Sequence, residues 1–473
     1  MRLIPIYSWT RGVRNFNKRN SRFSKQPWAQ GVILLLCVAV AMLLANLPFT
    51  RDIYHSILST DLGLSVRTPS GHGFVFPKGM TVLNFVNDVL MVIFFFSVGL
   101  EIRREIDHGE LSTPKKAILP VIAAFGGVCV PAIIFTVINH GTYASSGWGI
   151  PTATDIAFSI GILSMLGDRV PLSLKIFLAT LAVADDLIAI LVVALFYGGK
   201  INFLLLGAAL LVILVTVLIN RLGEKRPTFY LFHALLVWTL FYYAGIHSTM
   251  CGVIMAFLIP MKPRYNRAYY YRKRDQFRRR LTEYDLIEDA GDFPNGPQRH
   301  CLRKLSHISK YCVGMTDRME HMLSPWVNFL IMPLFALANA GVTITDPSYF
   351  NIFRFSPVEG SVSLGIFLGL LLGKPIGITL ASFIAIKTGV GAMPSKATWK
   401  MLFAVACLGG IGFTMSIFVD TLSFTDQLPE VTSKLQDMGK IAVLLGSLCA
   451  GVLGALLITL VSRGRKADTT SLS

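Results

Sequence analysis

Apolar segments recur along the whole chain, and most of them have the length of a membrane-spanning helix. In lipid every backbone polar group must be paired internally, so we expect these segments to be helices and not strands. The pattern predicts an all-α membrane protein with one membrane domain. The twelve segments are 28–47, 82–100, 117–138, 149–166, 172–197, 201–220, 228–245, 247–260, 323–341, 361–386, 399–419 and 438–462.

Basic residues crowd into alternate loops between these segments. By contrast, the 139–148 loop has no Lys or Arg and the 420–437 loop has a single Lys. Because an excess of Lys and Arg marks cytoplasmic loops, we expect a multi-pass protein of a bacterial inner membrane with both termini in the cytoplasm. The predicted parts are a basic cytoplasmic N-terminus at 1–27, spans one to eight at 28–260, a long basic cytoplasmic loop at 261–321, spans nine to twelve at 322–462 and a cytoplasmic tail at 463–473.

Composition agrees with this organisation. The chain of 473 residues is 53% hydrophobic and only 15% charged, whereas soluble domains have about 25% charged residues. The net charge of +17 alone would suit nucleic-acid binding, but its placement fits the positive-inside pattern, so we predict no nucleic-acid partner. The first apolar segment is too long for a signal-peptide core and lacks a small-residue cleavage site, so it is expected to remain as a helix.

Motifs for enzymatic chemistry are missing from the sequence. The seven cysteines have neither metal-ligand nor disulfide spacing. We find no nucleophile–base constellation, phosphate loop or zinc motif. The sequence therefore predicts a protein that is not an enzyme and has no cofactor.

Two of the apolar segments are interrupted by helix-weakening residues. The 149–166 segment begins with Gly149-Ile150-Pro151, and the 399–419 segment contains Gly409-Gly410-Ile411-Gly412. Matching interruptions in the two halves of a chain indicate discontinuous helices at a transporter binding site. The alternative is that the glycines only permit close helix packing.

Asp185 and Asp186 are adjacent carboxylates in the middle of an apolar segment, with no other charged residue between Lys175 and Lys200. A charge within a span costs about 2.5–3.5 kcal/mol on insertion scales. Two carboxylates in one span therefore indicate a specific structural or functional role. Burial and mutual repulsion favour protonation, and carboxylate oxygens suit a hard cation. A site that holds either a sodium ion or protons is the minimal chemistry of exchange. The alternative is a structural pair fixed by hydrogen bonds or a salt bridge.

Three more polar residues lie in or beside interrupted or apolar segments. Lys374 can act as a counter-ion to one of the aspartates, since an unpaired ammonium there would lose its proton. Asp155 can neutralise the positive ends of half-helices or bind a cation itself. Thr154 can lend an oxygen to the site or bond its own backbone.

Titratable residues near segment ends are candidates for a response to pH. His247 at the junction of two spans can sense pH or act as a cap. Glu320 and His321 lie at the cytoplasmic start of the ninth span, just before its apolar segment, where the helix dipole alone would favour Glu320. A more specific hypothesis is that these two residues form a pH-sensing cluster with Glu101, Arg104 and Glu105, which follow the second segment. The full candidate set is Glu101, Arg104, Glu105, His247, Glu320 and His321.

Six motifs, in the same order, together resemble NhaA-type sodium/proton antiporters over residues 28 to 460. They are NDVLMVIFFFSVGLEIRRE (87–105), WGIPTATDIAFSIGILSMLG (148–167), LAVADDLIAILVVALFY (181–197), MPLFALANAGV (332–342), GLLLGKPIGI (369–378) and CLGGIGFTMSIF (407–418). The resemblance implies twelve helices, an inverted repeat relating spans three to five with ten to twelve, and two interrupted helices that cross near mid-membrane. It also implies electrogenic, pH-regulated expulsion of sodium or lithium in exchange for external protons, for control of internal pH and sodium, by a homodimer.

The resemblance also implies roles for individual residues. Asp186 matches the principal ion-binding carboxylate, Asp185 the second carrier, and Lys374 the essential lysine that can pair with Asp185. Thr154 and Asp155 match the crossing segment. The candidate set for pH sensing, apart from His247, matches the region of the family that responds to pH.

Two departures from the family pattern affect the expected pH profile. The family often has a histidine where this chain has Ser324, and the 261–321 loop is longer than usual. Two alternatives to antiport stay open on the sequence alone. A sodium-coupled symporter of an organic anion would share the interrupted helices but needs a cationic pocket beyond Lys374. A channel or membrane-bound sensor would show uncoupled conductance or no flux.

Overall fold

The computed structural model describes residues 27–67, 73–76, 79–198, 201–287, 294–344, 351–353, 355–356, 360–424 and 427–470. Residues 1–26 of the predicted basic N-terminal segment and residues 471–473 of the predicted tail lie outside this description. The chain divides into two compact units. One comprises Met1–Met91, Glu105–Gly198 and Asn328–Ser473, and the other comprises Val92–Arg104 and Gly199–Val327.

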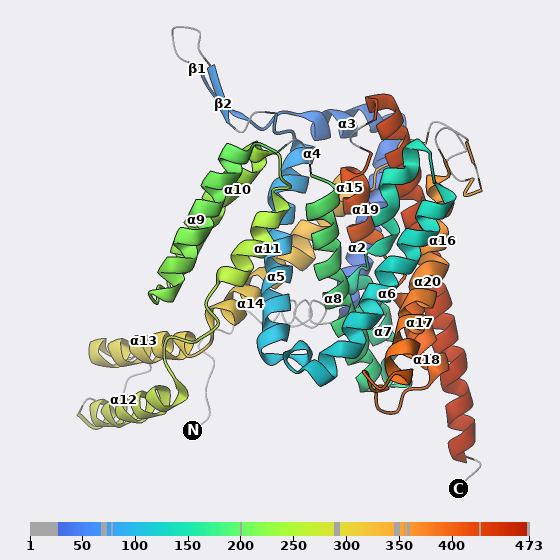
Figure 1. Ribbon diagram of the computed structural model, residues 1–473. Coiled ribbons are helices and arrows are strands. Elements are labelled where there is room, and N and C mark those ends of the chain that lie inside the picture. Colours follow the sequence, from blue (N-terminus) through green and yellow to red (C-terminus); the bar gives the residue numbers. More distant parts are fainter. Residues whose placement is uncertain are drawn as a thin grey trace. The chain divides into compact units, whose positions relative to one another are not determined.

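The first unit holds most of the helices (Figure 1). In chain order they and the two strands are α2 (Pro27–Asn46), α3 (Arg51–Ser59), β1 (Leu64–Arg67), β2 (Gly73–Phe76), α4 (Val82–Asn84), η2 (Phe85–Leu90), η3 (Glu110–Ser112), α6 (Pro114–Ile138), η4 (Tyr143–Thr152), α7 (Ile156–Met165), η5 (Gly167–Arg169), α8 (Leu172–Phe196), α15 (Met332–Asn339), α16 (Val362–Leu368), η8 (Gly369–Gly373), α17 (Lys374–Lys387), α18 (Trp399–Leu408), α19 (Phe413–Leu422) and α20 (Pro429–Thr470).

The second unit is also helical. Its helices are α9 (Phe203–Arg221), α10 (Pro227–Ala244), α11 (Thr249–Leu258), α12 (Arg267–Ile287), α13 (Gly296–Tyr311) and α14 (Met315–Trp326), while α5 (Met91–His108) and η6 (Val327–Ile331) have residues in both units. In the described part of the long 261–321 loop, helices α12 and α13 precede the start of α14 and pack on each other through a small buried cluster of Phe277, Cys301 and Ile308.

The apolar segments form helices, as the sequence predicts. Among the described residues, eight helices are long and apolar enough to cross a membrane, and the pair α18 and α19, bent by 51°, would make a ninth. Two further apolar helices, α7 and α11, have only 10 residues each. The chain is thus a predominantly α-helical membrane protein with several apolar spans. The one β element in the described residues is an antiparallel ribbon in which Leu64 pairs with Phe76.

The first unit is organised around α6, which packs against α8, α16 and α17. The helices α17, α18 and α20 lie side by side, and α2 packs on α7 and α15 (Figure 1). Small residues allow the closest of these approaches. A Cβ built on Gly377 of α17 would overlap the carbonyl oxygen of Gly126 in α6, and a Cβ on Gly126 would overlap the carbonyl oxygen of Gly377. The glycines at this crossing therefore bring α17, and Lys374 at its start, close to α6.

This crossing gives a first prediction. Gly377→Ala is expected to destabilise the protein by about 1–3 kcal/mol, because the added methyl group forces two backbones apart. Thermal unfolding of the purified protein in detergent measures the effect. The matched control is Gly207→Ala in α9, where an added Cβ meets no described atom within 4 Å. Equal melting temperatures for the two variants would contradict the close approach.

Candidate functional site

The centre of the first unit holds a fully buried ion pair. Asp185 in α8 and Lys374 at the start of α17 are both 0% exposed, and Lys374 Nζ donates to Asp185 Oδ2 at 2.5 Å. The same ammonium donates to Thr154 Oγ1 at 2.9 Å. Burying an ion pair is favourable only when the charges are close and well hydrogen-bonded. Here the two charges are in contact, and Thr154 accepts a second hydrogen bond from the ammonium.

Local sequence explains where these two side chains lie. The α8 sequence from Leu172 to Phe196 contains no Gly or Pro, so the aspartates stand on a continuous helix. Lys374 follows the π-helical turn η8 and precedes Pro375, which has no N–H to donate to the preceding turn. Such π-helical turns occur frequently at functional sites, because they shift the side chains that follow them.

Asp186 lies beside the ion pair but faces another direction, because neighbouring helical residues differ by about 100°. Its side chain is 2% exposed, and its charge acts on Lys374. Asp185 Oδ1 accepts no hydrogen bond from any residue that the structure describes. The two carboxylates are therefore not equivalent, since Asp185 accepts a hydrogen bond from Lys374 and Asp186 points in another direction.

The segment that joins η4 to α7 supplies Thr154 and connects it to the break between α18 and α19. Thr154 Oγ1 donates to the carbonyl oxygen of Gly409 at 2.7 Å, and the Asp155 N–H donates to the carbonyl oxygen of Ile411 at 2.6 Å. Ser159 Oγ donates to the carbonyl oxygen of Leu408 at 2.8 Å. The last carbonyls of a helix have no partner within it, and here residues of the α7 segment provide one.

The carboxylate of Asp155 accepts hydrogen bonds at the N-termini of two helices. Its Oδ2 accepts from the Thr414 N–H at 3.2 Å and from Thr414 Oγ1 at 2.5 Å, at the start of α19. Its Oδ1 accepts from the Phe158 N–H at 3.3 Å and so caps α7. Helix N-termini carry positive partial charge, and a buried carboxylate between two of them balances both.

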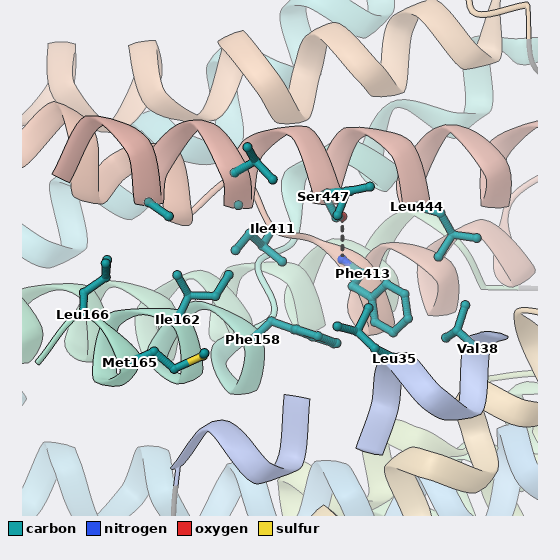
Figure 2. A pocket seen from close by; sticks show the side chains of 14 residues that line it. Leu35, Val38, Phe158, Ile162, Met165, Leu166, Ile411, Phe413, Leu444 and Ser447 are labelled. Atoms are coloured by element: carbon teal, nitrogen blue, oxygen red, sulfur yellow. Dashed lines mark hydrogen bonds between the residues drawn. The ribbon is translucent and has the colours of Figure 1, made fainter. Parts of the chain in front are cut away.

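Figure 2 shows the other side of this break, where α20 contributes Ser447. Ser447 Oγ accepts from the N–H groups of Gly412 and Phe413 at 3.2 and 3.1 Å. An apolar pocket of about 590 Å³ lies next to these bonds, and Phe158 and Ile411 are among its lining residues. Apart from that hydroxyl its lining side chains are apolar, so it offers no ligands for an ion.

No group of three or more His, Cys, Asp and Glu side chains that could hold a metal ion occurs in the described part of the chain. The buried centre instead offers carboxylate and hydroxyl oxygens, which suit a proton or a hard monovalent cation.

The candidates for pH sensing lie mostly in the second unit. In the second unit, Arg104 of α5 forms an ion pair with Glu320 of α14. His321 is exposed and lies 3.7 Å from Asp317, one turn earlier. The prediction that Glu320 begins a helix is wrong, because α14 begins at Met315 and places Asp317 in its first turn. Hydropathy marks only the apolar part of a helix, and here polar turns precede that part.

The remaining candidates stand at helix ends or within α5. Glu105 accepts a hydrogen bond from the Glu110 N–H at 3.1 Å, just beyond the end of α5. His247 lies between α10 and α11, after Gly245, whose positive φ of 80° ends α10. Glu101 lies one turn before Glu105 on α5 and is half-buried.

Three residues of this site were not singled out from the sequence: Ser159, Thr414 and Ser447. Thr414 could have been found from its position, because it follows the Gly409–Gly412 interruption by two residues, much as Thr154 lies at the first interruption. Ser447 gave no signal, since a serine in an apolar helix usually bonds its own backbone.

Buried ionisable side chains at a place where helices end inside an apolar protein are typical of secondary transporters. The family model described as Na+/H+ antiporter 1 matches residues 21–458 of the chain. This match covers most of the chain, so the protein belongs to the Na+/H+ antiporter 1 family.

Curated relatives agree with this assignment. The Na(+)/H(+) antiporter NhaA of Oleidesulfovibrio alaskensis is 40% identical over 450 residues, which cover 94% of this chain and 95% of the relative. The protein of the same name from Wolinella succinogenes is 40% identical over 436 residues, or 92% of each chain. That of Helicobacter pylori is 40% identical over 435 residues, 92% of this chain and 93% of its own length.

Proposed function

We propose that this protein is a secondary active transporter that exchanges sodium or lithium ions for protons. In this proposal it expels sodium electrogenically from the cytoplasm, takes in external protons, and so controls internal pH and sodium. The observation that carries the proposal is the buried pair of Asp185 and Lys374 with Asp186 beside it. Membership of the Na+/H+ antiporter 1 family supports the same activity.

Competition for the carboxylates explains the coupling. Asp186 is the principal cation ligand and Asp185 the second carrier of an ion or proton. A sodium ion near Asp185 repels the Lys374 ammonium, because two cations cannot share one buried carboxylate at low cost. Protons neutralise the same carboxylates and so exclude the cation. The site therefore carries either a sodium ion or protons, which is the requirement for exchange.

The proposed transporter has twelve membrane helices, an inverted repeat relating spans three to five with ten to twelve, and a crossing of the interrupted spans near mid-membrane. Both termini and the 261–321 loop face the cytoplasm, and two copies form a homodimer. The hydrogen bonds from Thr154 to Gly409 and from Thr414 to Asp155 support a crossing of the interrupted spans.

Regulation by pH is assigned to the cytoplasmic ends of helices. The Arg104–Glu320 ion pair supports this assignment, because it joins two of the candidate residues. A proton on the glutamate would remove one charge of the pair. The further candidates are Glu101, Glu105, His247 and His321.

The organic-anion symporter has less support than the antiporter. Lys374 is the cation that such a substrate would need, and its ammonium is engaged by Asp185 and Thr154. The curated relatives are named as antiporters.

Everted membrane vesicles that carry the protein test the proposal. After respiration has built a proton gradient, added sodium or lithium should dissipate it, as read by recovery of a quenched pH-sensitive dye. Potassium should give no recovery, and vesicles without the protein should give none with any of the three ions. Absence of a sodium response across pH 6.5 to 9, or an equal response to potassium, would contradict sodium/proton antiport.

A further inference from the structure

A second buried carboxyl group lies away from the Asp185–Asp186 site. Asp420 stands near the end of α19 and is 0% exposed. Neither of its carboxyl oxygens accepts a hydrogen bond from any residue that the structure describes. The proposed ion exchange does not use this side chain, although acidic groups inside a membrane protein are rare and are usually functional.

The carboxyl group of Asp420 lies directly against the backbone of α20. A Cβ built on Gly439 would overlap Asp420 Oδ1, so only glycine leaves room for the acid at this position. This contact packs the second half of the broken span against the last helix of the chain. The carboxyl group is thus held in a close-fitting place and not at a solvated surface.

In the part of the chain that the structure describes, the charged groups that act on Asp420 are Lys440 and Asp437, both from α20. They partner each other, with Lys440 Nζ 4.0 Å from Asp437 Oδ1. Tyr197, just after α8, also interacts electrostatically with Asp420. The other elements that pack on α19, namely α15 and η4, contain no Asp, Glu, Lys, Arg or His.

An ionised carboxylate in this place would be poorly compensated. It would have no described hydrogen-bond donor, and Lys440, the lysine that acts on it among the described residues, is already close to a competing aspartate. A protonated carboxyl group carries no charge and fits the same space. We propose that Asp420 is a second proton-binding site, separate from the Asp185–Asp186 site, and that its proton is required for α19 to pack closely on α20.

The position of Asp420 connects this proton to the exchange site. Thr414, which bonds Asp155, lies six residues earlier on the same helix, a rise of about 9 Å. Loss of the Asp420 proton would place a negative charge beside the Gly439 backbone and the like charge of Asp437. The expected response is a shift of α19, which would disturb the Thr414–Asp155 bonds. This functional consequence rests on the proposed antiport, whereas the proton site itself does not.

Infrared difference spectroscopy of the purified protein tests the proton site directly. The wild-type spectrum minus that of Asp420→Asn should contain the carbonyl band of a protonated carboxyl group at neutral pH. The band should persist when sodium is added and should disappear as the pH becomes alkaline. Its absence at neutral pH would overturn the proposal, since Asp420 would then be ionised.

The pH dependence of the melting temperature is the second test of the proposal. Asp420→Asn imitates the neutral acid, so its alkaline loss of stability should begin about one pH unit later than in the wild type, a tenfold change in proton concentration. The control Glu430→Gln, which removes an exposed acid at the start of α20, should follow the wild-type curve. A curve for Asp420→Asn that coincides with the wild type would overturn the proposal.

A pair of glycine variants tests the packing. Gly439→Ala should lower the melting temperature, and Asp420→Ala in the same chain should restore it, because it removes the group that the new methyl would meet. Gly451→Ala in the same helix is the control, since its added Cβ lies no closer than 3.3 Å to Ile162 Cδ1. Failure of Asp420→Ala to restore stability would count against the contact.

Exchange assays separate this inference from the proposed antiport. Sodium/proton exchange by Asp420→Asn should continue to a pH about one unit higher than in the wild type. A wild type without any exchange would defeat the proposed function and the link between Asp420 and exchange, while the infrared result would still decide the proton site.

Discussion

Sodium/proton exchange should fall to the background of empty vesicles when Asp186 is replaced by asparagine. The side chain is 2% exposed and stands next to the Asp185–Lys374 pair, so its charge acts in a place with little water. Asparagine keeps the size of the side chain but can neither carry the negative charge nor release a proton. Removing a buried charge–charge attraction of about 3 kcal/mol corresponds to about a hundredfold weaker cation binding.

Two measurements define this result. Dye recovery in everted vesicles should be absent in Asp186→Asn at sodium concentrations that saturate the wild type, and the purified variant should bind little radioactive sodium at these concentrations. Asp186→Glu, which keeps the carboxylate, should retain part of the exchange. Thr180→Val, a change of similar shape on the same helix, should behave as the wild type, because the described hydrogen bond of this hydroxyl goes to the Ile176 carbonyl one turn earlier. Full exchange by Asp186→Asn would remove this residue from the site.

The membrane helices could be predicted from sequence because backbone N–H and C=O groups in lipid must be hydrogen-bonded within the segment. Within the described residues, the apolar segments lie on helices, although two of the segments considered spans give helices of only 10 residues. Helix ends were predicted less well. Segment 399–419 was expected to end at residue 419, whereas α19 continues to Leu422 and so includes Asp420. That acid was therefore not among the candidate residues.

The partners of the buried charges could be predicted only in part. The residues themselves allowed Lys374 to be a counter-ion to one of two adjacent aspartates but did not say which one, because the two side chains point about 100° apart. The family resemblance suggested Asp185, and the structure has that contact. The bonds of Thr414 to Asp155 and of Ser447 to Phe413 depend on how separate helices pack. No local sequence pattern reports such packing.

The short ribbon of β1 and β2 was also absent from the expected all-α fold. It joins α3 to α4 and has only four residues in each strand. Apolar periodicity over so few residues gives no clear signal for a strand. Hydropathy therefore predicted the membrane part of the fold and left this connection out.

Lys374→Met is expected to destabilise the protein by about 3–5 kcal/mol, since it leaves the Asp185 carboxylate buried without its counter-ion. Adding Asp185→Asn to the same chain should recover most of that loss, because a pair of neutral side chains needs no compensation in the interior. The hydroxyl of Thr154 keeps its bond to Gly409 in both variants, so the break between α18 and α19 retains this support.

Thermal unfolding of the single and double variants forms a double-mutant cycle. The matched control is Lys387→Met at the other end of α17, where the lysine is exposed and the change should cost less than about 1 kcal/mol. If the double variant were as unstable as Lys374→Met alone, the lysine would stabilise the fold by packing and not by its charge. Recovery of stability in the double variant without recovery of exchange would separate the role of the pair in folding from its role in transport. It would show that the fold is stable without the ion pair but that exchange requires it.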